Sequence, residues 1–214
     1  MPSEISGYEA GTWDLDPVHS QIGFAARHLM VSKVRGRFTK FDVQVVTAEN
    51  PLDSTVTASI DTASVDTGNE MRDNDLRSER FLDTASHPLM TFRSTGVTQD
   101  GDKYKVTGDL TIRGVTKPIT LDVEVGGFGA DPYGGTRAGF SATTEINRTD
   151  FGVDFNAPIP GGVMVSEKVA IEIEGEAVLR RRSDPGRDGQ ARRVTRRVIR
   201  GPPCHPPLTV GARP

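Results

Sequence analysis

The chain has 214 residues, of which 26 are basic and 29 acidic, and its 23 glycines and 14 prolines favour many turns over long helices. No stretch approaches the roughly 20 consecutive apolar residues that span a bilayer. The first residues lack the basic and apolar regions of a secretory signal, and a single cysteine, Cys204, excludes an intrachain disulfide. We therefore expect a soluble, cytoplasmic protein.

Charge is distributed unevenly along the chain. Residues 180–214 contain ten arginines and two aspartates, whereas residues 1–179 contain 16 basic and 27 acidic residues. The C-terminal part also lacks a sustained hydrophobic pattern, which is typical of disorder because little apolar surface can be buried. The sequence predicts a folded domain over 1–179 and a disordered, Arg/Pro-rich tail over 180–214.

The first two strands are predicted within residues 14–38. Apolar residues there alternate with polar ones, so one face of the second strand carries Ile22, Phe24, Ala26, His28 and Met30. The same period of two recurs at Val56, Ala58 and Ile60. Such strands bury one face and expose the other, which favours antiparallel sheet.

Residues 67–88 break this alternation. They are charged, and Asp66 and Thr67, at the start of this segment, are residue types that cap helices. A short helix is predicted near 69–80, followed by Phe81 and Leu82 at an end of the sheet structure. The alternative is a surface helix whose charged side chains form local ion pairs.

Amphipathic strands return after this segment. They are separated by turn sequences such as Asp100-Gly101 and are read in KYKVTGDLTIRG (103–114), ITLDVEV (119–125), TRAGFSATTEIN (136–147) and EKVAIEIEGEAVL (167–179). About eight short amphipathic strands predict an all-β, antiparallel barrel or sandwich, and closure into a barrel would remove exposed edges.

Many positions on the predicted inner faces are small. They are Ala26, Ala58, Gly108, Ala138, Ala142, Gly175 and Ala177. Alanine and glycine cannot fill an interior to native density without a neighbour's volume. The phenylalanines at 24, 38, 41, 92 and 140 either supply that volume or line a tunnel. The residues alone leave a filled core and a ligand cavity open, because eight-stranded barrels adopt both.

His28 is the candidate for a polar contact inside, since it shares a strand face with Phe24. The alternative is a core histidine bonded to a backbone carbonyl. No catalytic residue is predicted: Ser20 lacks a glycine-flanked nucleophile elbow, and the adjacent His19 points to the opposite strand face.

Metal binding is not predicted either. His19, His28 and His87 are scattered rather than spaced as paired ligands. The arginine-rich tail is accompanied by no nucleic-acid-binding motif, so no specific nucleic acid is expected as a partner. Such a tail would suit transient contact with an anionic membrane. The alternative is an extension that folds back loosely on the acidic domain.

Four stretches together resemble the YceI-like family of lipocalin-like polyisoprenoid-binding proteins. They are WDLDPVHSQIGFAARHLMVSKVRGRF (13–38), NEMRDNDLRSERFLDTASHPLMTFRS (69–94), VTGDLTIRGVTKPITLDV (106–123) and RTDFGVDF (148–155). A final strand around 164–179 completes the resemblance. Position 75 departs, because many members have histidine where this chain has Asp75.

The resemblance implies an eight-stranded antiparallel barrel around an elongated cavity for an amphiphilic isoprenoid, such as a quinone, or a similar long-chain lipid. It implies a carrier, store or scavenger rather than an enzyme, and no cofactor. The residues expected to contact the ligand are Phe24, Ala26, His28, Met30, Phe38, Phe41, Arg72, Asp75, Phe81, Phe92, Ile112 and Phe140.

Two other functions remain open from the sequence. One is an enzyme that acts on such a lipid through His19 or His28. The other is an interaction module that recruits an anionic partner through the basic tail. A homodimer is also compatible with an exposed strand edge.

Overall fold

The computed structural model describes residues 5–29, 31–132, 134–159 and 162–180. Apart from Arg180, the predicted disordered tail therefore lies outside the described residues, as does Met30. Among the residues that are described, no helix is long and apolar enough to cross a membrane.

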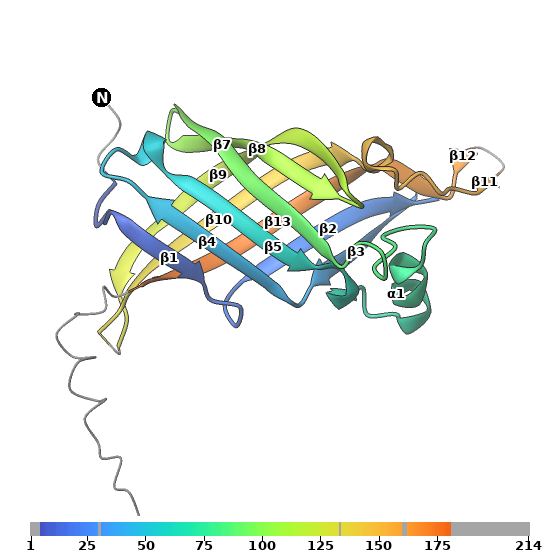
Figure 1. The fold of residues 1–214 in the computed structure, drawn as a ribbon, viewed down its shortest axis with the longest axis horizontal. Coiled ribbons are helices and arrows are strands. Elements are labelled where there is room, and N and C mark those ends of the chain that lie inside the picture. Colours follow the sequence, from blue (N-terminus) through green and yellow to red (C-terminus); the bar gives the residue numbers. More distant parts are fainter. Residues whose placement is uncertain (1–4, 30, 133, 160–161, 181–214) are drawn as a thin grey trace, which may run out of the picture. The chain divides into compact units, whose positions relative to one another are not determined.

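The fold is an antiparallel β-barrel (Figure 1). Its main strands are β1 (Gly11–Leu15), β4 (Phe41–Thr47), β5 (Thr55–Asp61), β7 (Leu89–Asp100), β8 (Lys103–Ile112), β9 (Val115–Ala130), β10 (Thr136–Asn147) and β13 (Val165–Leu179). These eight strands pair in that order, and β13 pairs back with β1, which closes the sheet. The predicted eight-stranded barrel is confirmed.

The barrel is extended by β2 (Gln21–His28), β3 (Ser32–Phe38) and β6 (Val65–Asp66). Along one side of β13, its first part pairs with β2 and its last part with β1. The two strands predicted within 14–38 are therefore three segments, because the chain bends between β1 and β2. A small hairpin of β11 (Pro158–Ile159) and β12 (Gly162–Val163) forms a separate sheet.

The predicted helix is present as α1 (Glu70–Arg77), and short 3-10 turns lie at Pro51–Asp53, Thr62–Ser64 and Arg148–Phe151. The residue that caps α1 is Asn69 rather than the predicted Asp66 or Thr67: the Asn69 side chain accepts a hydrogen bond from the Arg72 backbone N–H. Thr67 instead donates its backbone and hydroxyl hydrogens to Asp73, whose side chain is buried. The residues before the helix thus stabilise its first turn from outside.

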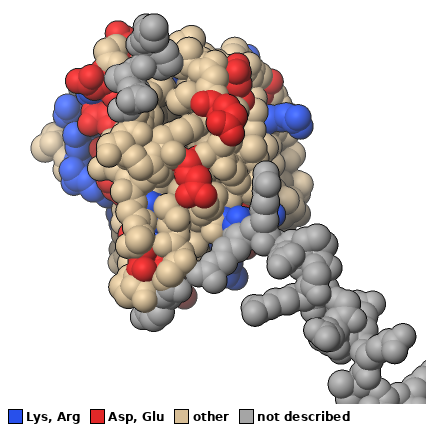
Figure 2. Space-filling model, turned by 90° about the vertical axis from the view of Figure 1, so that its left-hand side faces the viewer, with Lys and Arg blue, Asp and Glu red and all other residues tan. Residues whose placement is uncertain are grey.

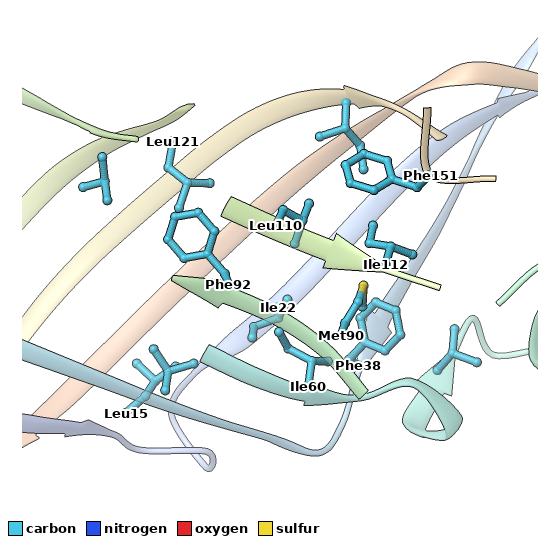
Figure 3. Close-up of a cluster of buried hydrophobic side chains, with 14 of the residues drawn as sticks. Leu15, Ile22, Phe38, Ile60, Met90, Phe92, Leu110, Ile112, Leu121 and Phe151 are labelled. Carbon is cyan, nitrogen blue, oxygen red and sulfur yellow. The ribbon is translucent and has the colours of Figure 1, made fainter. Parts of the chain in front are cut away.

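Alternation along each strand directs apolar side chains into the barrel. Figure 3 shows such side chains from different strands, among them Ile60, Phe92 and Leu110, directed toward the interior. Trp13 and Phe151 are the largest fully buried side chains. The buried hydrophobic cluster therefore forms the inner wall of the barrel.

Candidate ligand cavity

The barrel encloses a cavity of about 370 Å³. This volume lies within the roughly 300–1,000 Å³ of small-molecule sites. Its wall takes side chains from every main strand and is apolar apart from a few residues. The polar or partly polar residues in it are Tyr8, Trp13, Thr47, Ser54, Tyr104 and Arg148.

Three phenylalanines lie against glycines of neighbouring strands. A Cβ added at Gly36, Gly108 or Gly175 would collide with the ring of Phe24, Phe92 or Phe140, respectively. Each ring therefore occupies the space that a side chain at the glycine would need. The rings lie along the wall rather than across the centre, which explains how a barrel rich in phenylalanine retains a cavity.

The polar groups at the end near the N-terminal segment are paired within the protein. Tyr8 donates its hydroxyl to the Ala48 carbonyl at 2.6 Å. Thr47 Oγ1 accepts from Trp13 Nε1 at 2.8 Å and donates to the Glu9 carbonyl at 2.8 Å. Ser54 Oγ accepts from the Ala48 backbone N–H. These groups stabilise the loops around that end.

Tyr104 is the exception. Its side chain is 6% exposed, and its hydroxyl is the one buried side-chain polar atom of the described residues without a hydrogen-bond partner. Burial raises the pKa of the Tyr104 phenol, and the nearby Tyr8 adds to the shift. The group is therefore neutral over the physiological pH range.

Arg148 is the cation of the wall and is also buried. Its Nε donates to the Ser166 carbonyl at 3.0 Å, and its Nη1 donates to the carbonyls of Val153 and Phe155. Burial lowers the pKa of this guanidinium. Arg148 thus holds the 148–155 segment against the start of β13.

The end beside α1 is covered by the helix and the residues after it. Leu76, Phe81 and Leu82 line the cavity there. Arg113, in the β8–β9 turn, donates one guanidinium nitrogen to the carbonyls of Phe81 (2.8 Å) and Gly152 (3.0 Å). These hydrogen bonds connect the segment after α1, at Phe81, to the β8–β9 turn of the barrel.

The structure places seven of the twelve predicted ligand residues in the wall: Phe24, Ala26, Phe38, Phe81, Phe92, Ile112 and Phe140. The other four that the structure describes, His28, Phe41, Arg72 and Asp75, do not line the cavity. His28 follows Ala26 on the same strand face but lies beyond the wall residues of β2. Phe41 packs against the core from the β3–β4 corner.

The two predicted contacts on α1 have partners of their own. Arg72 donates to the hydroxyl and carbonyl of Thr67. Asp75, at the position that departs from the family pattern, forms an ion pair with Arg80 at 3.6 Å. The Arg80 guanidinium carbon in turn lies 3.7 Å from the ring centre of Phe155.

A separate polar cluster lies outside the barrel at the β1–β2 corner. Asp16, His19 and Glu176 offer atoms within 4.8 Å of one another that could hold a metal ion. The Arg137 guanidinium donates to both carboxylates and already compensates their charge. Among the described residues, the Ser20 hydroxyl bonds to the backbone of Glu176, at 3.0 and 3.4 Å, and forms no hydrogen bond with His19.

Sequence reasoning missed Tyr104 and Arg148 as wall residues. Tyr104 alternates with polar neighbours in KYKVTGDLTIRG, which predicts an inward side chain, but nothing local reveals whether its hydroxyl finds a partner. Arg148 begins the RTDFGVDF stretch, where an arginine next to alternating apolar residues was the available signal. Because charged residues are rarely buried, that signal alone is weak.

Comparisons with known proteins agree with this architecture. The YceI-like domain family matches residues 13–177. Protein YceI of Escherichia coli O157:H7 is 45% identical over 141 residues, which cover 65% of this chain and 74% of that protein.

Two solved structures share the fold. Burkholderia cenocepacia BcnA superposes with a TM-score of 0.68 at 26% identity, over 76% of this chain and 98% of that one. A polyisoprenoid binding domain from Saccharophagus degradans, implicated in plant cell wall breakdown, has a TM-score of 0.61 at 17% identity. It covers 80% of this chain and 100% of that domain, and the likeness is one of fold.

Proposed function

Because the chain belongs to the YceI-like domain family, we propose that its barrel binds an amphiphilic isoprenoid, such as a quinone, or a similar long-chain lipid. The protein acts as a carrier, store or scavenger of that lipid, without catalysis. The observation that carries this proposal is the almost entirely apolar cavity inside the barrel, whose wall includes Tyr104 near one end and Phe81 and Leu82 at the other.

An apolar cavity supplies the driving force for such a ligand. Each methylene moved from water to an apolar wall stabilises the complex by roughly 0.8 kcal/mol. Along β8, the wall residues run from Tyr104 to Ile112, eight residue steps or about 26 Å of strand. An elongated hydrocarbon chain fits this shape better than a compact solute.

The ligand class is suggested by a structural neighbour. The Saccharophagus degradans domain of the same fold is a polyisoprenoid binding domain. At 17% identity, the likeness is one of fold, and the isoprenoid ligand is our proposal for this chain.

A role without catalysis is supported by the chemistry of the wall. Its ionisable groups in the described residues are Tyr8, Tyr104 and Arg148, and no carboxylate, histidine or thiol lies among them. General acid–base catalysis near neutral pH usually needs such a group. The exposed His19 is paired with Asp16 at 2.9 Å, outside the barrel.

The test is mass spectrometry of the organic extract from the full chain purified without detergent. We expect a lipid with a long apolar chain at close to one equivalent per protein. An extract without lipid, from protein that also takes up no added prenol, would contradict the proposal.

A further inference from the structure

The hydroxyl of Tyr104 is a polar group built into an apolar cavity without a partner. Its residue is 6% exposed, and the ring belongs to the wall. A buried hydroxyl that makes no hydrogen bond costs free energy, which a fully apolar side chain such as phenylalanine would avoid. A ligand that supplies the missing hydrogen bond would recover this cost.

The unpaired hydroxyl of Tyr104 lies at one particular end of the cavity. Tyr104 follows the β7–β8 turn at Gly101–Asp102, and Figure 1 shows this turn at the end of the barrel opposite α1. The other polar side chains at this end, Tyr8, Thr47 and Ser54, already have protein partners. Among the described polar side chains at this end, Tyr104 is therefore the one that is free to hydrogen-bond a ligand.

The surroundings favour a neutral ligand group over an anionic one. Among the described residues, Arg148 is the single cation of the wall, and it lies in the 148–155 segment at the α1 end. Figure 2 shows the left-hand end of the molecule in Figure 1, where acidic and basic side chains both lie on the outer surface among uncharged residues. The exposed Lys103 and Lys105, on either side of Tyr104, form ion pairs there with Glu124 and Asp122 and do not line the cavity. An anionic head group at this end would be desolvated without a compensating charge.

We infer that the Tyr104 hydroxyl hydrogen-bonds a neutral oxygen of the bound lipid, a hydroxyl or a carbonyl, and so fixes the ligand's polar group at the end of the cavity away from α1. This inference rests on the proposed function and adds to it the chemical class of the polar group and its orientation. The chain of the lipid then runs along the barrel toward Phe81 and Leu82.

The test compares ligands that differ only in their polar group. Full-length protein, freed of lipid, is titrated with geranylgeraniol, with the hydrocarbon that has the same carbon skeleton and double bonds but no hydroxyl, and with geranylgeranyl monophosphate. The variant is Tyr104→Phe, which removes the hydroxyl and keeps the ring. Tyr8→Phe is the matched control, because it removes a hydroxyl from the same cavity that already donates to Ala48.

For Tyr104→Phe we expect the dissociation constant of the alcohol to rise about tenfold, the value of one hydrogen bond. The hydrocarbon should bind as tightly as to the wild type. Tyr8→Phe should leave the ratio between alcohol and hydrocarbon unchanged. The melting temperature of ligand-free Tyr104→Phe should equal or exceed that of the wild type, which shows that the variant is folded.

Three results would overturn the inference. One is unchanged alcohol binding by Tyr104→Phe. Another is an equal loss of alcohol and hydrocarbon, which would indicate a change of cavity shape. The third is preferred binding of the monophosphate without dependence on Tyr104. If the wild type binds none of the three probes, the proposed function itself fails, and this result is distinct from the other three.

Discussion

The ring of Phe140 lies over Gly175, the residue paired with it on the neighbouring strand β13. The glycine has no side chain, so the ring rests against the wall and the centre of the barrel stays open. Phe24 repeats the arrangement over Gly36, its partner on β3, and Phe92 lies over Gly108, two residues from its own partner Leu110 on β8. Three such pairs account for a cavity in a sequence whose phenylalanines could have filled it.

Gly175→Ala should therefore destabilise the protein. The added methyl would meet the Phe140 ring and force it from its position, at a cost of about 1–3 kcal/mol in the free energy of unfolding. Gly139→Ala is the control, because a Cβ there meets nothing within 4 Å. Urea denaturation measures both, and equal effects of the two substitutions would contradict the role of the pair.

Arg113→Met should loosen the segment that covers the α1 end of the cavity. The substitution removes the hydrogen bonds to the carbonyls of Phe81 and Gly152, with an expected loss of about 1–3 kcal/mol. Hydrogen exchange of residues 78–84 should accelerate. Lys117→Met, an exposed position of the same hairpin, should not change it. Unchanged exchange in Arg113→Met would show that packing alone holds this segment.

Arg148→Met should cause a larger loss, about 3 kcal/mol or more, because it leaves several buried carbonyls without a donor. Arg148→Lys should not restore stability, since one ammonium cannot replace the planar guanidinium at all of these carbonyls. Denaturation by urea, with the exposed Arg93→Met as control, measures the difference. Rescue by lysine would show that the charge matters and the geometry does not.

Acid should destabilise the β1–β2 corner. The hydrogen bonds from His19 and then Arg137 hold the pKa of Asp16 below its usual value of 3.8. Because the pKa of Asp16 is lower in the folded protein than in the unfolded chain, the ionised carboxylate stabilises the fold at a pH above the unfolded-state pKa. This stabilisation is lost as the pH falls below about 4. The wild type should lose melting temperature between pH 5 and lower values, whereas Asp16→Asn should lose less over the same range.

Asp102→Asn, in the exposed β7–β8 turn, is the control for this acid effect. It should follow the wild-type pH dependence of the melting temperature. If Asp16→Asn also follows the wild type, the ionised Asp16 carboxylate does not contribute to stability at this corner.

The strands could be predicted because the inward side chains alternate locally. On β8, the alternation places Tyr104, Val106 and Leu110 inside, and the structure buries all three. The helix was recognisable because residues 67–88 interrupt this period. The division between β1 and β2 was not recognisable, because it depends on which part of β13 pairs with each segment.

The cavity itself depends on contacts between residues that are far apart in the sequence. Phe140 and Gly175 were both assigned to inner faces, but their pairing requires the register of two strands. The unpaired hydroxyl of Tyr104 depends in the same way on where Tyr8 and Ser54 find their partners. Local patterns therefore predicted the wall, whereas the opening within it required the three-dimensional structure.

The most direct test of lipid binding inside the barrel is native mass spectrometry of three full-length proteins purified without detergent. They are the wild type, Ala58→Trp, which places a large side chain in the cavity wall, and Thr57→Trp, which places the same side chain on the exposed face of β5. We predict a bound long-chain lipid in the wild type and in Thr57→Trp, and a strongly reduced amount in Ala58→Trp. Equal lipid in all three, or none in the wild type, would contradict binding in the interior.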